Sequence, residues 1–209
     1  MRGLHVLIGL GLLGTLASPA AASPQRDYAA CVARVQPGAV DRLLEAQSDD
    51  SSRRAFRDVA HNEYCYARAY ASGTYQLQDD ALSVEVMRGL FAEQYLLRNS
   101  RTVAALSALP MQSRSYVRPW FAATGRAVAV DEMASCMADT DPAGVMGLLR
   151  TVPGSWGEQA WMTSLPASLS RCLAAGVHLD ANRTALRAAL ADALYQRVRA
   201  QPATMTSSR

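Results

Sequence analysis

The sequence predicts an all-α protein built from two tandem repeats of three to four helices each, with one disulfide in each repeat. Apolar residues recur at helical spacing, and no stretch has the alternation with period two that is typical of strands. A cysteine, a proline and a Leu-Leu pair also recur at one spacing in the two halves. They are Cys31, Pro37 and Leu43-Leu44, and then Cys136, Pro142 and Leu148-Leu149.

Residues 1–22 have the pattern of a secretory signal peptide. Arg2 supplies the positive charge, residues 4–16 form a short apolar run, and Ala20-Ala21-Ala22 offers a cleavage site. The run is shorter than the ~20 residues of a membrane-spanning helix. We therefore expect cleavage, no transmembrane segment in the mature chain, and export to the periplasm or the extracellular medium.

The first repeat is expected over residues 23–98. It begins with a helix over 26–35, and Pro37 suits the first position of a second helix. A longer helix is predicted over 53–69 and a last one over 81–97, capped by Asp79-Asp80. Residues 99–118 are expected to form a connector.

The second repeat is expected over residues 119–200, followed by a disordered tail over 201–209. Pro119 begins a helix that should continue to about residue 138, and Asp141-Pro142 is a strong start signal for the next. A helix over 156–175 follows, interrupted near Pro166. In the last helix, capped by Asp180, a stripe repeats every four residues and should pack within its own repeat: Leu186, Leu190, Leu194 and Val198.

Four cysteines in an exported chain indicate disulfides. Four cysteines allow three pairings, and the sequence alone does not choose among them. If each repeat is self-contained, however, the pairs are Cys31–Cys65 and Cys136–Cys172. A zinc site is disfavoured because structural zinc sites use closely spaced cysteine pairs.

Near the end of each repeat, an arginine is followed five residues later by an acid. These pairs are Arg88 with Glu93 and Arg187 with Asp192. The matching positions indicate a recurrent structural ion pair. Together with the paired cysteines, this ending resembles uncharacterised small exported all-helical proteins of Gram-negative bacteria with a duplicated paired-cysteine repeat. The resemblance implies a fold and an exported location, and it implies no activity.

The formal net charge of +3 gives no electrostatic case for nucleic-acid binding. The charge is nevertheless uneven, because no acid lies between Glu93 and Asp131 while five arginines do. Arginines interleaved with aromatics suit an anionic partner such as a phosphorylated lipid or an acidic glycan of the envelope. The candidate anion-binding residues are Arg114, Arg118, Trp120 and Arg126. The alternative, which we favour, is that the aromatics enter the core and the arginines solvate the surface.

The sequence offers little for catalysis. Only His61 and His178 remain after signal cleavage, which excludes the common multi-histidine zinc motifs, so we expect no metal or cofactor. Glycosidase chemistry needs only two suitably separated acids, and the acids that could converge are Glu63, Glu93 and Glu132. We predict a non-enzymatic exported module that acts through binding or envelope structure, with a cell-envelope hydrolase using paired carboxylates as the alternative.

Overall fold

The computed structural model describes residues 24–70, 83–111, 116–173, 176–177 and 182–201, and every regular element in these ranges is a helix. The predicted all-α class is thus confirmed for this part of the chain. The signal peptide, nearly all of the predicted tail, and the caps predicted at Asp79-Asp80 and Asp180 lie outside the described residues. The helices are α1 (Pro24–Val35), α2 (Pro37–Leu44), α3 (Asp49–Ala60), α4 (Glu63–Tyr70), α5 (Val84–Arg98), α6 (Ser100–Ala104), the 3-10 helix η2 (Pro119–Ala123), α7 (Val128–Thr140), α8 (Pro142–Arg150), α9 (Trp156–Ser164), α10 (Pro166–Cys172) and α11 (Arg183–Arg199).

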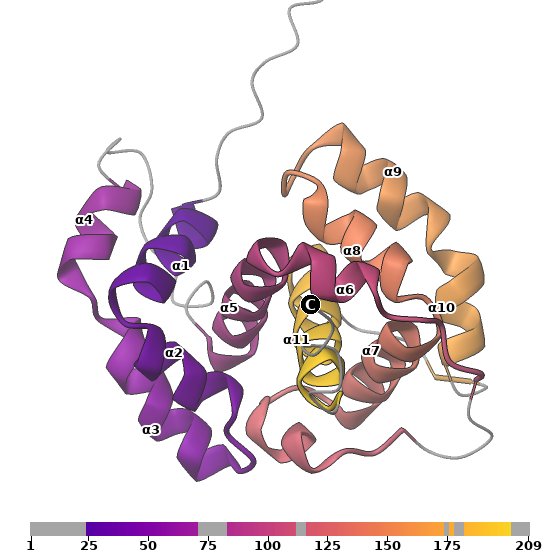
Figure 1. The fold of residues 1–209 in the computed structure, drawn as a ribbon, viewed down its shortest axis with the longest axis horizontal. Helices are drawn as coiled ribbons and strands as arrows, with labels where there is room; N and C mark the ends of the chain where they lie inside the picture. The colour runs from indigo at the N-terminus through magenta and orange to yellow at the C-terminus, as the bar shows by residue number, and fades with distance from the viewer. Residues whose placement is uncertain (1–23, 71–82, 112–115, 174–175, 178–181, 202–209) are drawn as a thin grey trace, which may run out of the picture.

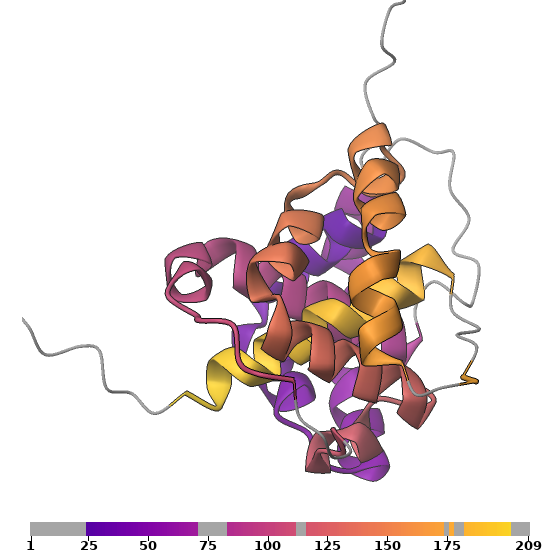
Figure 2. The same cartoon turned by 90° about the vertical axis from the view of Figure 1, so that its right-hand side faces the viewer.

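Helices α5 and α11 cross at the centre of the molecule (Figures 1 and 2). Helices α1 to α4 lie on the α5 side, and α7 to α10 lie on the α11 side (Figure 1). At the crossing, a Cβ atom added to Gly89 would lie 2.2 Å from the Cα of Ala188. Glycine at this position therefore lets the two helix backbones approach closely.

The two predicted disulfides are present. Cys31–Cys65 joins α1 to α4, and Cys136–Cys172 joins α7 to α10. Each bond therefore attaches an outer helix to a helix that contributes to the core. Two disulfides fit an oxidising, exported environment.

Helix α11 is buried on nearly all sides because α5, α7 and α8 surround it. Leu190 and Leu194 are completely buried, and Leu186 is half-buried. The expectation that this stripe packs within its own repeat was incomplete, since α5 of the first half is a main partner. None of the helices in the described ranges is long and apolar enough to cross a lipid bilayer.

The single helix predicted over residues 53–69 is two helices in the structure. The Tyr28 hydroxyl causes the break, because it donates to the Val59 carbonyl at 2.6 Å and accepts from the Asn62 amide at 3.1 Å. The Asn62 side chain then accepts from the Cys65 amide at 2.9 Å and starts α4. A tyrosine from α1 thus ends α3, which local sequence signals could not indicate.

The helix predicted from Pro119 to about residue 138 is also divided, into η2 and α7. Gly125 lies between them with φ +75°, a left-handed conformation that glycine tolerates. The Thr124 hydroxyl donates to Asp131 at 2.6 Å and holds this turn against α7. The start signal at Asp141-Pro142 is confirmed, since the Asp141 carboxylate accepts from the Gly144 amide at 2.8 Å.

Candidate binding site

The arginine that recurs at a matching position in each half is buried in an ionic cluster between α5 and α11. Arg88 is fully buried, and its Nε donates to Asp192 of α11 at 3.0 Å. Its remaining N–H groups donate to the carbonyls of Leu43 and Leu44, at the C-terminal end of α2. The guanidinium therefore neutralises a buried acid and also satisfies helix-end carbonyls that have no intrahelical partner.

Arg187 repeats this arrangement in the other direction. It binds Glu93 of α5 through two hydrogen bonds, of 2.8 and 3.0 Å. It also donates to the carbonyls of Leu148 and Leu149, at the C-terminal end of α8. The predicted structural ion pairs therefore exist, but each arginine bonds the acid of the other half of the chain.

A second arginine and a second acid complete each cluster. Arg126 bridges Asp131 and Asp192, both at 2.7 Å, while Arg26 binds Glu93 at 2.8 Å beside Arg187 and Glu158. Each cluster thus contains two arginines and two acids and is formally neutral. A neutral cluster avoids the high cost of an unpaired buried charge.

The pKa values of the buried aspartates follow from these contacts. Burial alone would raise the pKa of Asp192, but the positive charges of Arg88 and Arg126 outweigh burial, so its pKa is lowered. At Asp131 burial outweighs the effect of Arg126 and the Thr124 hydrogen bond, so its pKa is raised. Asp192, which contacts two arginines, is therefore the more strongly held anion.

The three acids considered for a hydrolase do not form a catalytic pair. Glu63 is exposed on α4, Glu93 is buried in its ionic cluster, and Glu132 is half-buried on α7. Of these three acids, Glu93 does converge with another carboxylate, Glu158, and the two share Arg187. Arginine N–H groups and the Gly154 amide occupy their oxygens, so neither carboxylate is free to act on a substrate.

A groove of about 1010 Å³ lies beside the C-terminal half of α11. Its walls come from α7, α11, η2, the segment after α6 and the end of α2, which are distributed along the whole described chain. Several polar side chains face an aromatic and apolar wall, as is usual for small-ligand sites. The residues that matter below are Arg118, Trp120, Ser135, Asp139, Tyr195 and Arg197.

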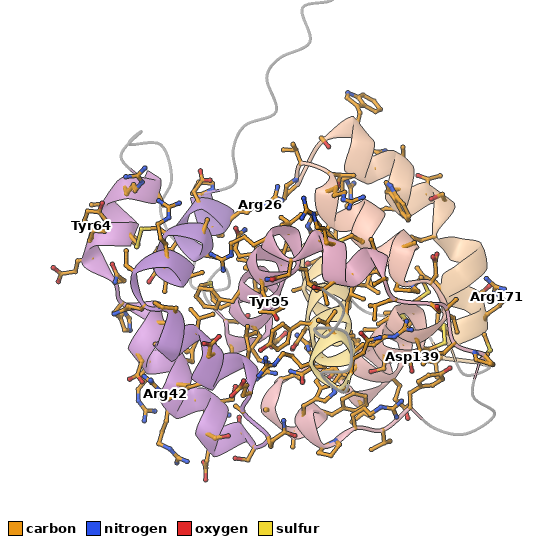
Figure 3. The ribbon with its side chains drawn as sticks, in the orientation of Figure 1. Arg26, Arg42, Tyr64, Tyr95, Asp139 and Arg171 are labelled. Atoms are coloured by element: carbon orange, nitrogen blue, oxygen red, sulfur yellow. A yellow bond between two sulfur atoms is a disulfide. The ribbon has the colours of Figure 1, made fainter. Side chains whose placement is uncertain are left out.

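Arg197 and Asp139 fix the shape of the groove. Arg197 donates to the carbonyls of Ala138 and Asp139 at the end of α7, and to that of Ser107. The Leu109 amide donates to the Asp139 carbonyl at 2.7 Å. These bonds hold the segment after α6 against α7, so the groove is preformed (Figure 3 labels Asp139).

Arg118 is the cation that remains available in the groove. Its side chain is 32% exposed, and its Nη2 lies 3.5 Å from an Asp139 oxygen, a longer contact than those in the buried clusters. Its guanidinium also stacks over the Tyr116 ring at 5.7 Å. Burial raises the pKa of Asp139, and the charges of Arg197 and Arg118 oppose that rise.

Ser135 leaves a hydrogen-bonding group unused at the groove. The residue is 6% exposed, lines the groove from α7, and its hydroxyl has no hydrogen-bond partner among the described residues. A buried hydroxyl without a partner costs about 1–3 kcal/mol. A ligand with a polar group at this point would remove that cost. Burial also raises the pKa of Tyr195, in the same wall, to about 12, so its hydroxyl is neutral at physiological pH.

The structure describes three of the four candidate anion-binding residues and gives them different surroundings. Arg114 lies outside the described residues, and Arg126 is buried with its guanidinium committed to Asp131 and Asp192. Arg126 therefore does not belong to an exposed anion-binding surface. Trp120 enters the core, as the alternative interpretation had it, but it also lines the groove beside Arg118.

Sequence analysis did not identify Ser135, Asp139 or Arg197. They carry no motif, and α7 and α11 bring them together from distant parts of the chain. The described residues contain no group of three His, Cys, Asp or Glu side chains that could hold a metal ion. In comparisons with known proteins, no family model, no curated protein and no solved structure matches the chain.

Proposed function

We propose that the protein is an exported, non-enzymatic binding module and that the groove beside α11 receives an anionic ligand of the cell envelope. The observation that carries this proposal is the unpartnered Ser135 hydroxyl in a preformed groove that also contains Arg118 and Trp120. Arginine binds carboxylates and phosphates through two parallel hydrogen bonds. The Trp120 ring provides an apolar wall for the rest of the ligand.

The reciprocal ionic clusters support a chain of two tandem repeats, over residues 23–98 and 119–200. The arginine of each proposed repeat bonds the acid of the other and the Leu-Leu carbonyls of its own. Gly89 and Ala188, which meet at the crossing of α5 and α11, each directly follow one of these arginines. This exchange is what two copies of one unit would form around a two-fold axis.

Binding is favoured over hydrolysis because both carboxylates that line the groove are paired with arginines. Asp139 contacts Arg118 and Arg197, and Glu45 is engaged by Arg199 at 2.7 Å. A pair of carboxylates acting on a sugar needs one acid that can donate a proton and one that is free to attack or to activate water. The groove supplies recognition groups instead.

Replacing Ser135 with alanine tests the proposal through two effects of opposite sign. Ser135→Ala removes a buried hydroxyl without a partner, so the free protein should become more stable, while ligand binding should weaken. Ser52→Ala is the matched control, because Ser52 on α3 is also buried and unpartnered but does not line the groove. Ser52→Ala should raise stability and leave binding unchanged.

The assay is calorimetric titration of the mature protein with a galacturonic acid oligomer and, in parallel, with inorganic phosphate. Wild-type binding should weaken with added salt, because the Debye length falls below about 10 Å above 0.1 M. Arg118→Gln should abolish binding, whereas Arg101→Gln, at an exposed site on α6, should not. The proposal fails if neither probe binds at low salt, or if Ser135→Ala and Ser52→Ala bind equally well.

A further inference from the structure

The turn between α8 and α9 carries a tryptophan that the fold leaves in solvent. Trp156 is 85% exposed, the highest value among the exposed large hydrophobic side chains in the described ranges. Val152, four residues earlier, is exposed as well. Helix α9 lies at the periphery of the molecule in both views (Figures 1 and 2). The side chain is therefore accessible to a large partner.

The position of Trp156 is fixed by its surroundings. The Ser155 hydroxyl caps α9 by accepting from the Glu158 amide at 3.2 Å, and Glu158 accepts from the Gly154 amide at 2.7 Å. Trp161 anchors the same helix, because its ring lies so close to Gly147 that an added Cβ would be 2.2 Å away. One tryptophan of α9 thus holds the helix on the body while Trp156 projects from its first turn.

The charge around this turn is positive. Arg150 is exposed at the end of α8, and Arg183 is exposed at the start of α11. Arg183 lines the same 500 Å³ pocket as Pro153 and Gly154, so it lies beside the turn. Neither arginine has an ion-pair partner among the described residues.

Glu158, the acid in the first turn of α9, does not offset these two arginines. Glu158 is the only acid in the sequence between Asp141 and Asp180, and it is buried against Arg187. We define the Trp156 tip as Arg150, Val152, Trp156 and Arg183. It combines exposed apolar side chains with two arginines that have no ion-pair partner among the described residues.

We propose that the Trp156 tip docks the protein on the surface of an anionic phospholipid bilayer. A tryptophan side chain contributes about 150–250 Å² of surface, whereas a specific protein interface buries about 800 Å² on each partner. The tip is therefore small for a protein partner. It has the composition of a bilayer contact, in which tryptophan sits at the headgroup level and arginine is attracted by anionic lipids.

Vesicle binding of the mature protein provides the test. Wild type should co-sediment with vesicles of phosphatidylglycerol and phosphatidylcholine at low salt, and much less with phosphatidylcholine alone. Trp156→Ala should lower the partition coefficient about tenfold, and Arg150→Gln and Arg183→Gln should each lower it about fivefold. Tyr64→Ala is the matched control, since Tyr64 is an exposed aromatic on the distant α4 beside Glu63 and should have no effect (Figure 3).

Fluorescence identifies the residue that enters the bilayer. Brominated lipids should quench wild-type emission, and Trp156→Ala should lose that quenching, because Trp120 is buried and Trp161 is half-buried. Failure of wild type to bind anionic vesicles at low salt would overturn the proposal, as would equal binding by Trp156→Ala. If Arg118→Gln abolishes vesicle binding while Trp156→Ala does not, lipid binds in the groove and the tip is not the contact.

Discussion

Replacing Gly89 with alanine tests the close crossing of α5 and α11 on which the whole architecture depends. The added Cβ would meet the Cα, Cβ and carbonyl oxygen of Ala188 at 2.2, 2.3 and 2.5 Å. Ordinary contacts of a Cβ atom begin near 3.4 Å. Backbone atoms cannot swing aside as the end of a side chain can, so the two helices must separate by about 1 Å.

The magnitude follows from two opposing effects. Alanine favours a helix interior over glycine by about 0.5–1 kcal/mol, whereas overpacking a core costs about 1–3 kcal/mol or more. Here separation would also stretch the Arg88–Asp192 and Arg187–Glu93 bonds on either side of the crossing. We therefore expect Gly89→Ala to lower the free energy of unfolding by about 3 kcal/mol.

The assay is thermal and urea unfolding of the mature protein, with Gly38→Ala as the control. Gly38 also lies in a helix, but the nearest atom to its added Cβ is the flexible end of Arg42 at 3.9 Å. Gly89→Ala should reduce Tm by about 6–12 °C, while Gly38→Ala should raise it by about 1–4 °C. If Gly89→Ala melts at or above the wild-type temperature, the inferred helix contact is wrong.

Three further predictions concern the core. Leu190→Ala should lower the free energy of unfolding by about 2–5 kcal/mol, because the Leu190 side chain is completely buried. A change as small as that of an exposed substitution would contradict the packing of α11. Asp192→Asn should cost about 3–5 kcal/mol at neutral pH. Because the pKa of Asp192 is lowered in the folded protein, its ion pairs stabilise the fold above the ordinary pKa of about 3.9, and this stability is lost as pH falls through the folded pKa. In urea unfolding, the difference in free energy of unfolding between wild type and Asp192→Asn should therefore be smaller at pH 3 than at neutral pH. Peptide mapping without reduction should yield the links Cys31–Cys65 and Cys136–Cys172. A disulfide between the two halves of the chain would refute this pairing.

The parts of the fold that sequence predicted are those set by local chemistry or by the duplicated spacing. Pro37 and Asp141-Pro142 start helices where expected, because a first-turn proline and an aspartate cap act within a few residues. The break at Asn62 was missed because its cause is tertiary, and the break at Thr124 was missed because its cause is a side-chain contact rather than a start or stop signal. The Tyr28 hydroxyl ends α3 from another helix, and Asp131 holds the turn that precedes α7.

The candidate site was predictable only in part, because charge and aromaticity in a sequence do not reveal burial. Arg118 and Arg126 lie in the same acid-poor stretch, each within five residues of an aromatic residue, and Asp131 follows Arg126 by five residues. The fold places Arg126 between two buried aspartates and leaves Arg118 partly exposed in the groove. Ser135 became informative only when its hydroxyl was seen to lack a partner.

The ionic centre fixes how the two halves of the described chain are arranged. Buried ion pairs add little net stability, but a buried charge that loses its partner costs several kcal/mol. Each of Arg88 and Arg187 finds its acid only when α5 and α11 cross in the observed register. A shift of one helix by a turn would bring a guanidinium against apolar side chains and leave two carboxylates unpaired. The clusters therefore select one arrangement of the two halves. This arrangement also fixes where the groove and the Trp156 tip lie relative to each other.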